Sequence, residues 1–358
     1  MTTARIAALL LLVAGTLWAK PDWQSVRIPI LHPGSALGPL WAGLSGDLYI
    51  WTDTQGGVSG DVPTARLLHW DGEKWAVDLT LPGHEPASVF GAGERDVFVS
   101  ANKSVSGSDR GGVLFRSNDR GKSWTPQPLP AEAKNRRLGR LDGSYENIQV
   151  VVDGGSLLRF DGVAWNWCFK GETGAAGETL AINFQSANEG YFVYGRGWGR
   201  WIDGAWKFMP MEFGFRDARG LWGLRDRGGV LRLYAIDSHQ FSNGVRIWRF
   251  NPPMEDFDVE MEESSEDDLG AALGIWGSAQ DDIYVIAVIG DGKKPGSGRV
   301  YHFDGKSWTR ETSMGPIPSP VGITGTSRND VWITLQNGRL LHYSTATTLT
   351  RKMSSSTN

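Results

Sequence analysis

The chain has 358 residues and 40% hydrophobic residues, so it can bury a large core and is too apolar for wholesale disorder. Its net charge of −4, with no local cluster of Lys and Arg, argues against a nucleic-acid-binding protein. The 47 Gly and 17 Trp favour many short strands joined by tight turns.

The N-terminal segment has the three parts of a secretory signal peptide. Arg5 supplies a basic start, Ile6 to Ala19 form an apolar run, and the small residue Ala19 precedes Lys20. The apolar run of about 14 residues is shorter than the roughly 20 that a membrane-spanning helix needs. We therefore predict that residues 1–19 are removed on export to a secreted or periplasmic location. No later segment has the length and hydropathy of a membrane span.

One sequence pattern then recurs seven times, at intervals of about 40 to 50 residues. Its core is an apolar run with a period of two that is opened by a turn. The copies are GDLYIW (46–51), RDVFVS (95–100), ENIQVVV (146–152), EGYFVYG (189–195), GVLRLYA (229–235), DDIYVIA (281–287) and NDVWIT (329–334). Each copy is followed by a basic-aromatic strand, and a Gly-rich apolar strand precedes several. The unit is therefore three or four antiparallel strands, which we name a to d in chain order.

Seven units of this size predict an all-β fold, a seven-bladed β-propeller. A lone four-stranded sheet cannot bury its faces, whereas radial stacking buries both. Trp23 to Pro29 repeats the spacing of Trp124 to Pro130, and the seventh unit lacks a Trp after its third strand. Residues 23–29 are therefore expected to complete the last blade and close the ring. The propeller would occupy residues 20–347, followed by a disordered polar tail at 348–358.

An Asp, a Gly and then a Trp recur at the turn between strands c and d. Asp accepts backbone N–H groups across a tight turn, and Gly supplies the positive φ. We expect the Trp to wedge between neighbouring sheets, on the rim away from the b–c and d–a loops where propellers bind ligands. These residues receive a structural role: Asp71, Asp119, Asp161, Asp203, Asp304, Trp75, Trp124, Trp165, Trp206 and Trp308.

The histidines and the single cysteine give no indication of a metal or cofactor, and we expect neither. Three histidines occupy one position of strand c, so they should point outward from different blades: His69, His302 and His342. No metal-ligand spacing is present elsewhere. Cys168 lies among aromatic residues and is expected to be a small buried hydrophobe.

The loops between strands b and c vary most between the copies, and variable loops on a rigid scaffold commonly carry function. The residues selected there as candidates for ligand binding are Arg110, Arg196, Trp198, His239 and Lys293. Trp198 has two interpretations: an exposed ring that stacks on a sugar or a partner, or a ring packed against the next blade.

The segment 254–268 is acidic at nine of fifteen positions and falls in the d–a connection between the fifth and sixth blades. Two interpretations stay open. It is a solvated flexible loop, or it is a docking strip for a basic partner or a weak Ca²⁺ site, with Glu262 and Glu263 as candidate contacts. Its spacing matches no EF-hand loop.

The stretch SNDRGKSW (117–124) matches Ser-x-Asp-x-Gly-x-Ser/Thr-Trp, and the mature chain resembles the Asp-box (BNR-repeat) propellers. This superfamily includes sialidases and plant-type photosystem assembly factors. The resemblance to sialidases implies a carboxylate-binding Arg in an Arg-Ile-Pro motif, found here as Arg27-Ile28-Pro29, and an acidic Asp, for which Asp53 is the candidate. By register, however, Arg27 falls on an outer strand d. Three convergent Arg and a Tyr-Glu pair cannot be placed, so a recognisable sialidase catalytic set is missing.

We predict an exported, monomeric, non-catalytic propeller that presents a loop-lined rim to a protein or glycan partner. Two alternatives stay open: a glycan-cleaving enzyme, either a sialidase-like hydrolase or a lyase, and an assembly factor for a membrane complex. An axial pocket with three Arg and a Tyr-Glu pair would favour the enzyme. Co-purification from native membranes would favour the assembly factor.

Overall fold

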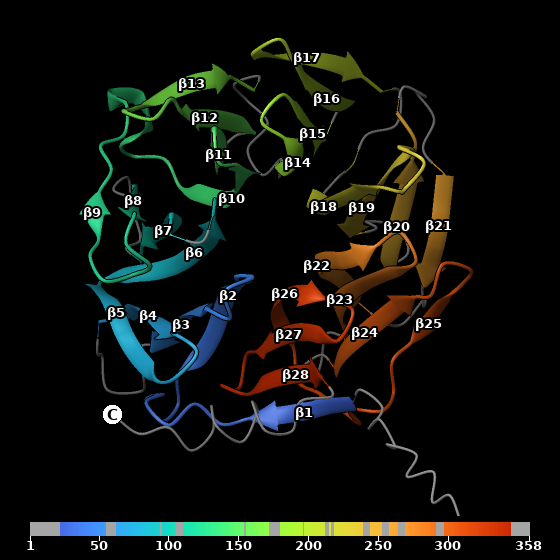
Figure 1. The fold of residues 1–358 in the computed structure, drawn as a ribbon, viewed down its shortest axis with the longest axis horizontal. Helices are drawn as coiled ribbons and strands as arrows, with labels where there is room; N and C mark the ends of the chain where they lie inside the picture. The colour runs from blue at the N-terminus through green and yellow to red at the C-terminus, as the bar shows by residue number, and fades with distance from the viewer. Residues whose placement is uncertain are drawn as a thin grey trace, which may run out of the picture.

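The computed structural model describes residues 22–54, 62–93, 95–104, 110–153, 155–171, 180–195, 197–211, 215, 218–238, 244–252, 258–263, 269–290 and 297–344. These residues form seven four-stranded antiparallel sheets and one short 3₁₀ helix, η1 (Ala131–Ala133). The sheets stand in a ring around a central axis (Figure 1). The predicted seven-bladed β-propeller is therefore confirmed. Within these residues, no helix is long and apolar enough to cross a membrane.

The four strands of each blade run from the axis outwards in chain order, except in the last blade. The inner strands a are β2 (Ala36–Ala42), β6 (His84–Gly91), β10 (Leu138–Ser144), β14 (Leu180–Ser186), β18 (Ala218–Arg225), β22 (Leu269–Ala279) and β26 (Pro320–Ser327). The second strands b are β3 (Leu48–Thr54), β7 (Val97–Lys103), β11 (Asn147–Val152), β15 (Glu189–Tyr194), β19 (Leu231–Ser238), β23 (Asp282–Gly290) and β27 (Asp330–Leu335). The third strands c are β4 (Thr64–Trp70), β8 (Gly112–Ser117), β12 (Ser156–Phe160), β16 (Gly197–Ile202), β20 (Val245–Phe250), β24 (Ser297–Phe303) and β28 (Leu340–Ser344). The outer strands d are β5 (Trp75–Pro82), β9 (Thr125–Pro126), β13 (Trp165–Phe169), β17 (Ala205–Pro210), β21 (Asp258–Glu263), β25 (Trp308–Arg310) and β1 (Asp22–Val26).

The ring is closed by the first strand of the chain, as the sequence predicts. β1 pairs antiparallel with β28, so that Trp23 lies opposite Tyr343 and Val26 opposite Leu340. In Figure 1 the blue strand β1 lies beside the red strand β28. The last blade therefore takes three strands from the C-terminal part of the chain and one from the N-terminal part.

The antiparallel order gives the ring two distinct rims. We call the rim that carries the a–b and c–d turns the turn rim. The rim that carries the b–c and d–a connections is the loop rim. Tight turns with positive-φ glycines, such as Gly72 and Gly162, occur on the turn rim.

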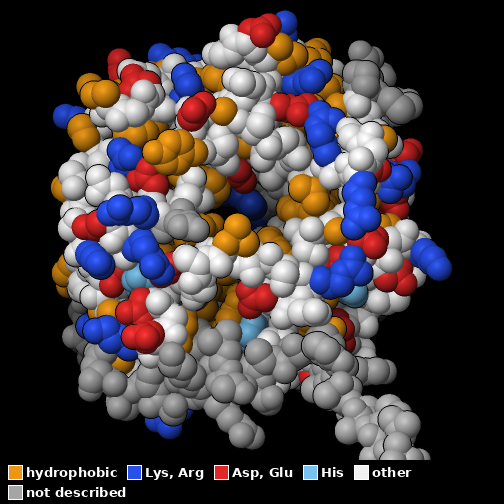
Figure 2. All heavy atoms as spheres, viewed as in Figure 1, with side chains coloured by type: hydrophobic (Ala, Val, Ile, Leu, Met, Phe, Trp, Pro, Cys, Tyr) orange, Lys and Arg blue, Asp and Glu red, His pale blue; other side chains and the backbone are white. Residues whose placement is uncertain are grey.

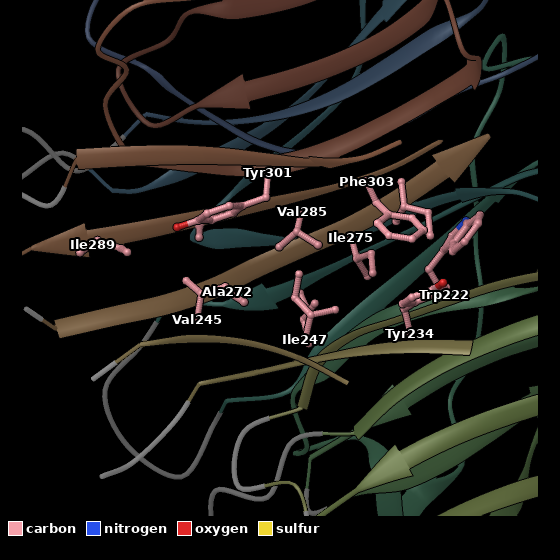
Figure 3. Packing of buried hydrophobic residues seen from close by; sticks show 13 residues of the cluster. Trp222, Tyr234, Val245, Ile247, Ala272, Ile275, Val285, Ile289, Tyr301 and Phe303 are labelled. Atoms are coloured by element: carbon pink, nitrogen blue, oxygen red, sulfur yellow. The ribbon is translucent and has the colours of Figure 1, made fainter. Parts of the chain in front are cut away.

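The apolar core is divided among the spaces between neighbouring blades. Figure 3 shows one of these clusters, in which Trp222 and Tyr234 of the fifth blade pack near Ile275 and Val285 of the sixth. Tyr234 and Val285 are fully buried. Because each sheet buries both faces in this way, a blade is stable only between its neighbours.

The Trp that begins an outer strand packs against the preceding blade. Edge-to-face ring pairs, with centroids 6.0–6.5 Å apart, join Trp124 to Tyr49, Trp165 to Phe98, Trp308 to Tyr234 and Trp23 to Tyr284. Such pairs contribute about 0.5–1.5 kcal/mol beyond the burial of area. The indole N–H of Trp206 donates to Gln149 Oε1 of the third blade at 2.9 Å. Trp75 belongs to one cluster with Trp332 of the last blade.

The acidic segment 254–268 was predicted to be a d–a loop, and for the part that the structure describes this prediction is wrong. Residues 258–263 form β21, the outer strand of the fifth blade, which pairs with β20. Arginines stabilise this charged strand: Arg246 Nη2 donates to Glu262 at 2.8 Å, and Arg299 of the next blade contacts Glu263. The two candidate contacts thus already have cationic partners within the protein. The rest of segment 254–268 lies outside the described residues.

Candidate functional site

A channel runs along the axis of the ring, walled by the inner strands of all seven blades. Its volume is about 500 Å³. Figure 2 shows the central hollow, with a basic side chain inside it and hydrophobic side chains around its mouth. The lining residues come mainly from the middle of each inner strand, for example residues 273–276 of β22 and 321–325 of β26. The cavity therefore lies about midway between the two rims.

One position of the inner strand forms a collar around this channel. In every blade the residue at this position pairs with the equivalent residue of the neighbouring strand b. Trp41 lies opposite Tyr49, for example, and Trp276 opposite Tyr284. The seven collar residues all line the channel: Trp41, Phe90, Asp142, Asn183, Trp222, Trp276 and Thr324. Four blades thus contribute an aromatic ring and three contribute a polar side chain.

Glycines in the next blade make room for the collar indoles. A Cβ added at Gly91 would lie 2.0 Å from the ring of Trp41, and one at Gly325 would lie 2.6 Å from that of Trp276. Each of these rings therefore rests directly on the inner strand of the following blade. The Gly-rich strands of the sequence pattern are explained by this contact.

Two arginines, Arg140 and Arg219, line the channel beyond the collar. Arg140 lies two residues before the collar position and Arg219 three, which places them about 7–10 Å further from the turn rim at roughly 3.3 Å per residue. The Arg219 side chain is exposed to solvent. The channel wall is thus cationic at this depth.

The collar carboxyl of Asp142 is the acidic group nearest to these arginines in the channel wall. It is buried, with Oδ2 3.6 Å from Arg140 Nη2, and it accepts the backbone N–H of Gly143 at 2.7 Å. Burial raises its pKa to about 6, against the opposing effect of Arg140 and the backbone N–H groups. At neutral pH the wall therefore carries two guanidinium groups and one carboxylate.

The sequence-selected loop residues do not gather at this channel. Trp198 is buried at 4% exposure, with its ring 5.6 Å from that of Phe250 and 6.4 Å from that of Tyr191. Of its two interpretations, packing is correct and an exposed stacking ring is wrong. Arg110 is exposed on the loop rim. Three candidates lie outside the described residues: Arg196, His239 and Lys293.

The residues singled out by the sialidase resemblance also lie apart from the collar. Arg27 is exposed and directly follows the outer strand β1, as the register predicts. Asp53 is at the loop-rim end of β3, where burial and the charge of Glu85 raise its pKa. Neither residue lines the channel.

A polar pair recurs near the turn rim. It joins a side chain at the start of strand b, either the first residue of the strand or the residue before it, to a basic side chain on strand c. In six blades these pairs are Asp47–His69, Asp96–Arg116, Asn147–Arg159, Glu189–Arg200, Asp282–His302 and Asp330–His342. In five of these blades the basic side chain also lies over the aromatic residue of strand b, as with His342 and Trp332, whose ring centroids are 3.5 Å apart. In the third blade Arg159 instead lies over Trp201 of the fourth blade. The three histidines therefore stabilise separate blades. In the described part of the chain, no three His, Cys, Asp or Glu side chains are grouped to hold a metal.

The pair in the first blade is enlarged into a charge cluster. His69 Nε2 is 3.0 Å from Asp47 and Nδ1 is 2.9 Å from Asp78, and both carboxylates are nearly buried. Asp78 is the extra residue of a β-bulge in β5, which turns its side chain towards His69. Burial lowers the pKa of His69, but the two carboxylates outweigh it and raise the pKa.

The Asp-box of the second blade forms a hydrogen-bonded turn, and its Arg120 side chain contacts this charge cluster. Asp119 accepts the backbone N–H of Ser123 at 2.9 Å, and Ser117 Oγ accepts that of Gly121 at 2.8 Å. Arg120 Nη2 then donates to Asp47 of the first blade at 2.7 Å. The same Asp-to-backbone turn occurs at Asp71, Asp161 and Asp304. Asp203 instead has a positive φ of 54°.

Sequence reasoning missed the collar, although part of its signal was visible. The stretches GLWGL (220–224) and LGIWGSAQ (273–280) join a Trp to glycines on an inner strand, a combination that repeats with GPLWAG (38–43). Arg140 and Arg219 have no such repeated signal. Their convergence follows only from the closed ring.

The fold and the axial site define a class: a seven-bladed β-propeller with an open, partly aromatic channel. No protein-family model matches the chain, and no curated protein matches its sequence. Solved structures do resemble it. A YCF48 protein bound to a D1 peptide is 16% identical, covers 93% of this chain and 99% of its own, and has a TM-score of 0.60. YCF48 from Cyanidioschyzon merolae is 14% identical, over 91% of this chain and 99% of its own, with a TM-score of 0.59.

An enzyme also shares the architecture. The GH74 enzyme of Niastella koreensis is 14% identical, covers 91% of this chain and 55% of its own, and has a TM-score of 0.61. At these identities the likeness establishes the propeller fold alone, because one propeller scaffold carries many functions.

Proposed function

We propose that this chain is an exported, non-catalytic β-propeller that binds a protein partner at its axial channel. The observation that carries the proposal is the channel itself, an open volume of about 500 Å³ bounded by side chains from all seven inner strands. A cavity of this size, with aromatic walls and a few polar groups, is typical of binding sites.

The chemistry of the wall favours binding over catalysis. The collar provides aromatic rings for contact area, and Arg140 and Arg219 provide fixed donors for an anionic group. The YCF48 structure supports a protein ligand, because a protein of similar fold is there bound to a D1 peptide. Export rests on the N-terminal segment 1–19, which lies outside the described residues.

The test is affinity capture with the mature chain, residues 20–358, followed by cross-linking and mass spectrometry. The double variant Arg140→Gln, Arg219→Gln removes the charge of the channel, and Arg110→Gln is a matched control on the loop rim. We expect one partner that is retained by the wild type and the control and lost by the double variant. Circular dichroism and thermal melting establish that each variant is folded.

Two results would contradict this function. A partner that is retained equally by the double variant would place binding away from the channel. Release of reducing sugar from a panel of glycans by the wild type, abolished by the channel variants, would favour the glycan-cleaving alternative.

A further inference from the structure

We propose that Asp142 regulates the channel in response to acid: its carboxylate pairs with Arg140 at neutral pH, and its protonation in weak acid frees Arg140 to bind an anionic group of the partner. This inference rests on the proposed function and adds a regulation of the same site. Its consequence is a channel that binds an anion more tightly as the pH falls.

The collar contains one ionisable side chain, and it belongs to Asp142. Among the described residues that line the channel, the other charged side chains are Arg140 and Arg219. Arginine stays protonated at any physiological pH. The charge of the channel wall therefore changes with pH through a single carboxyl.

The two carboxyl oxygens of Asp142 have different surroundings. Oδ1 accepts the backbone N–H of Gly143 at 2.7 Å and that of Phe184, on β14 of the next blade, at 3.4 Å. Oδ2 lies 3.6 Å from Arg140 Nη2, which makes an ion pair but is too long for a hydrogen bond. A proton can therefore bind to Oδ2 while Oδ1 keeps both backbone contacts. Protonation changes the charge and leaves the contact between the third and fourth blades in place.

Burial makes the ionised form of Asp142 unfavourable. The residue is 7% exposed. Its loss of hydration raises the pKa of the carboxyl to about 6, and Arg140 and the two backbone N–H groups oppose this rise only in part. The carboxyl is therefore mostly ionised at pH 7.5 and mostly protonated at pH 5.

The strands packed against β10 bring no other charged side chain close to Asp142. Neither β11 nor β14 contains a charged residue. The charged residues on β6 and at the two ends of β7 are His84, Glu85, Lys103 and Asp96. His84 and Glu85 precede the collar residue of β6 by six and five residues, which is about 16–20 Å along a strand. Lys103 pairs with His84 in the sheet, and Asp96 binds Arg116.

Protonation of Asp142 acts on an anionic ligand in two ways. At neutral pH its carboxylate neutralises the Arg140 guanidinium and also repels an incoming anion. Both effects end when the proton binds. Arg140 is then available for a charge-assisted hydrogen bond to a carboxylate of the partner. Acid therefore favours capture, and neutral pH favours release.

The experiment measures the binding of 1-anilinonaphthalene-8-sulfonate to the mature chain by fluorescence at pH 5 and pH 7.5. This probe combines aromatic rings with a sulfonate that stays ionised at both pH values, so a pH dependence comes from the protein. We expect its Kd for the wild type to be about tenfold lower at pH 5, from the gain of one charge-assisted contact. Near-ultraviolet circular dichroism establishes that the native packing is kept at both pH values.

Three variants separate the groups involved. Asp142→Asn has a neutral side chain of the same shape, so it should bind the probe tightly at both pH values, with less than about a twofold difference in Kd. Arg140→Gln should bind it about tenfold more weakly than the wild type at pH 5. Asp53→Asn is the matched control: burial and Glu85 raise the pKa of that carboxyl, but Asp53 does not line the channel. This control should keep the wild-type pH dependence.

A second measurement follows the proton itself. The carboxyl ¹³C signal of Asp142, assigned by its absence in Asp142→Asn, should titrate near pH 6. The inference would be overturned by a carboxyl that stays ionised at pH 4, by a wild type that binds no probe at pH 5, or by a pH dependence that survives in Asp142→Asn. Affinity capture that depends on the channel arginines but is equal at both pH values would overturn the regulation and leave the proposed function standing.

Discussion

The first and last blades carry the same polar pair but surround it differently. In both, a carboxylate of strand b holds a histidine of strand c that is stacked on an aromatic ring: Asp47, His69 and Tyr49 in one, Asp330, His342 and Trp332 in the other. The first blade adds a second carboxylate, Asp78. The last blade has the N-terminal strand β1 as its outer strand, and there Gln24 lies opposite His342 in an unbroken register.

The difference originates in one inserted residue. The outer strand of the first blade bulges at Asp78, which re-aims that side chain at the histidine. The same bulge occurs at Cys168 in the third blade and at Glu260 in the fifth. The polar pair is therefore common to most blades, whereas the bulge residue differs between blades and sets the charge beside the strand.

The largest expected effect comes from removing the acid shared by the whole cluster. Asp47 is buried, and it contacts Ser45, His69 and Arg120. Asp47→Ala would leave Arg120 without its carboxylate and His69 with Asp78 alone, so we expect the free energy of unfolding to fall by about 3–5 kcal/mol. Urea denaturation measures it.

The matched control is Asp330→Ala in the last blade, where the carboxylate is 27% exposed and contacts one histidine and no arginine among the ion pairs of the described residues. Its cost should be smaller, about 1–3 kcal/mol. Equal costs for the two variants would contradict a special role for the first-blade cluster.

The second effect is the loss of the bulge carboxylate, and it depends on pH. Asp78→Asn removes one of the two groups that raise the pKa of His69, so we expect a loss of about 1.5–3 kcal/mol. The contribution of a raised histidine pKa is complete below its unfolded value of about 6.5 and is lost as pH rises through the folded value.

The measurement is urea denaturation of wild type and Asp78→Asn at several pH values, with the His69 ring followed by NMR. The stability difference should be largest at low pH and shrink at alkaline pH. A difference that grows with pH would show that His69 is neutral in the folded protein.

The third effect concerns the equivalent bulge in the fifth blade. Glu260 Oε1 lies 2.5 Å from Arg249 Nη1, and the Arg249 side chain is 33% exposed. Because this pair is closer to solvent, Glu260→Gln should cost only about 0.5–1 kcal/mol. High salt should reduce the difference from wild type, and a salt-independent difference would argue against an ion pair.

The smallest effect is at Cys168, where the bulge residue carries no charge. Burial raises the pKa of its thiol to about 12, and its Sγ lies 3.3 Å from Gln149 Oε1. We expect no alkylation by iodoacetamide at pH 8 in the native protein and full alkylation in urea, measured by mass spectrometry. Rapid native labelling would contradict a half-buried structural thiol whose pKa is raised. Cys168→Ala should change stability by about 1 kcal/mol or less.

The seven-fold repeat made the architecture predictable, since strand patterns and turn chemistry are local. The closure by residues 22–26 was also predictable, because Trp23 to Pro29 repeats an outer-strand phrase. The acidic partners of the histidines were visible in GDLYIW, DDIYVIA and NDVWIT, always at the start of strand b. No pattern marks a bulge, so the approach of Asp78 to His69 was not predictable.

The candidate site was less accessible to sequence reasoning. The variable loops were the strongest sequence signal, whereas Arg140 and Arg219 come from blades three and five and line one channel only because the ring is closed. The acidic segment was placed in a loop because its charge disfavours a strand. Arg246, Arg249 and Arg299 neutralise that charge from neighbouring strands, which composition alone does not reveal.

The pairing of β1 with β28 has a consequence for how the molecule is made. β1 leaves the ribosome before every other strand of the ring, and it finds its partner only when β28 has been synthesised. Before β28 is made, β1 has no partner strand, and the blades form an open arc. The strands at the two ends of this arc carry unpaired backbone N–H and C=O groups, which are a known route to misassembly. The ring therefore matures in one late closing event, and a chain that stops short of Leu340 would remain an open arc.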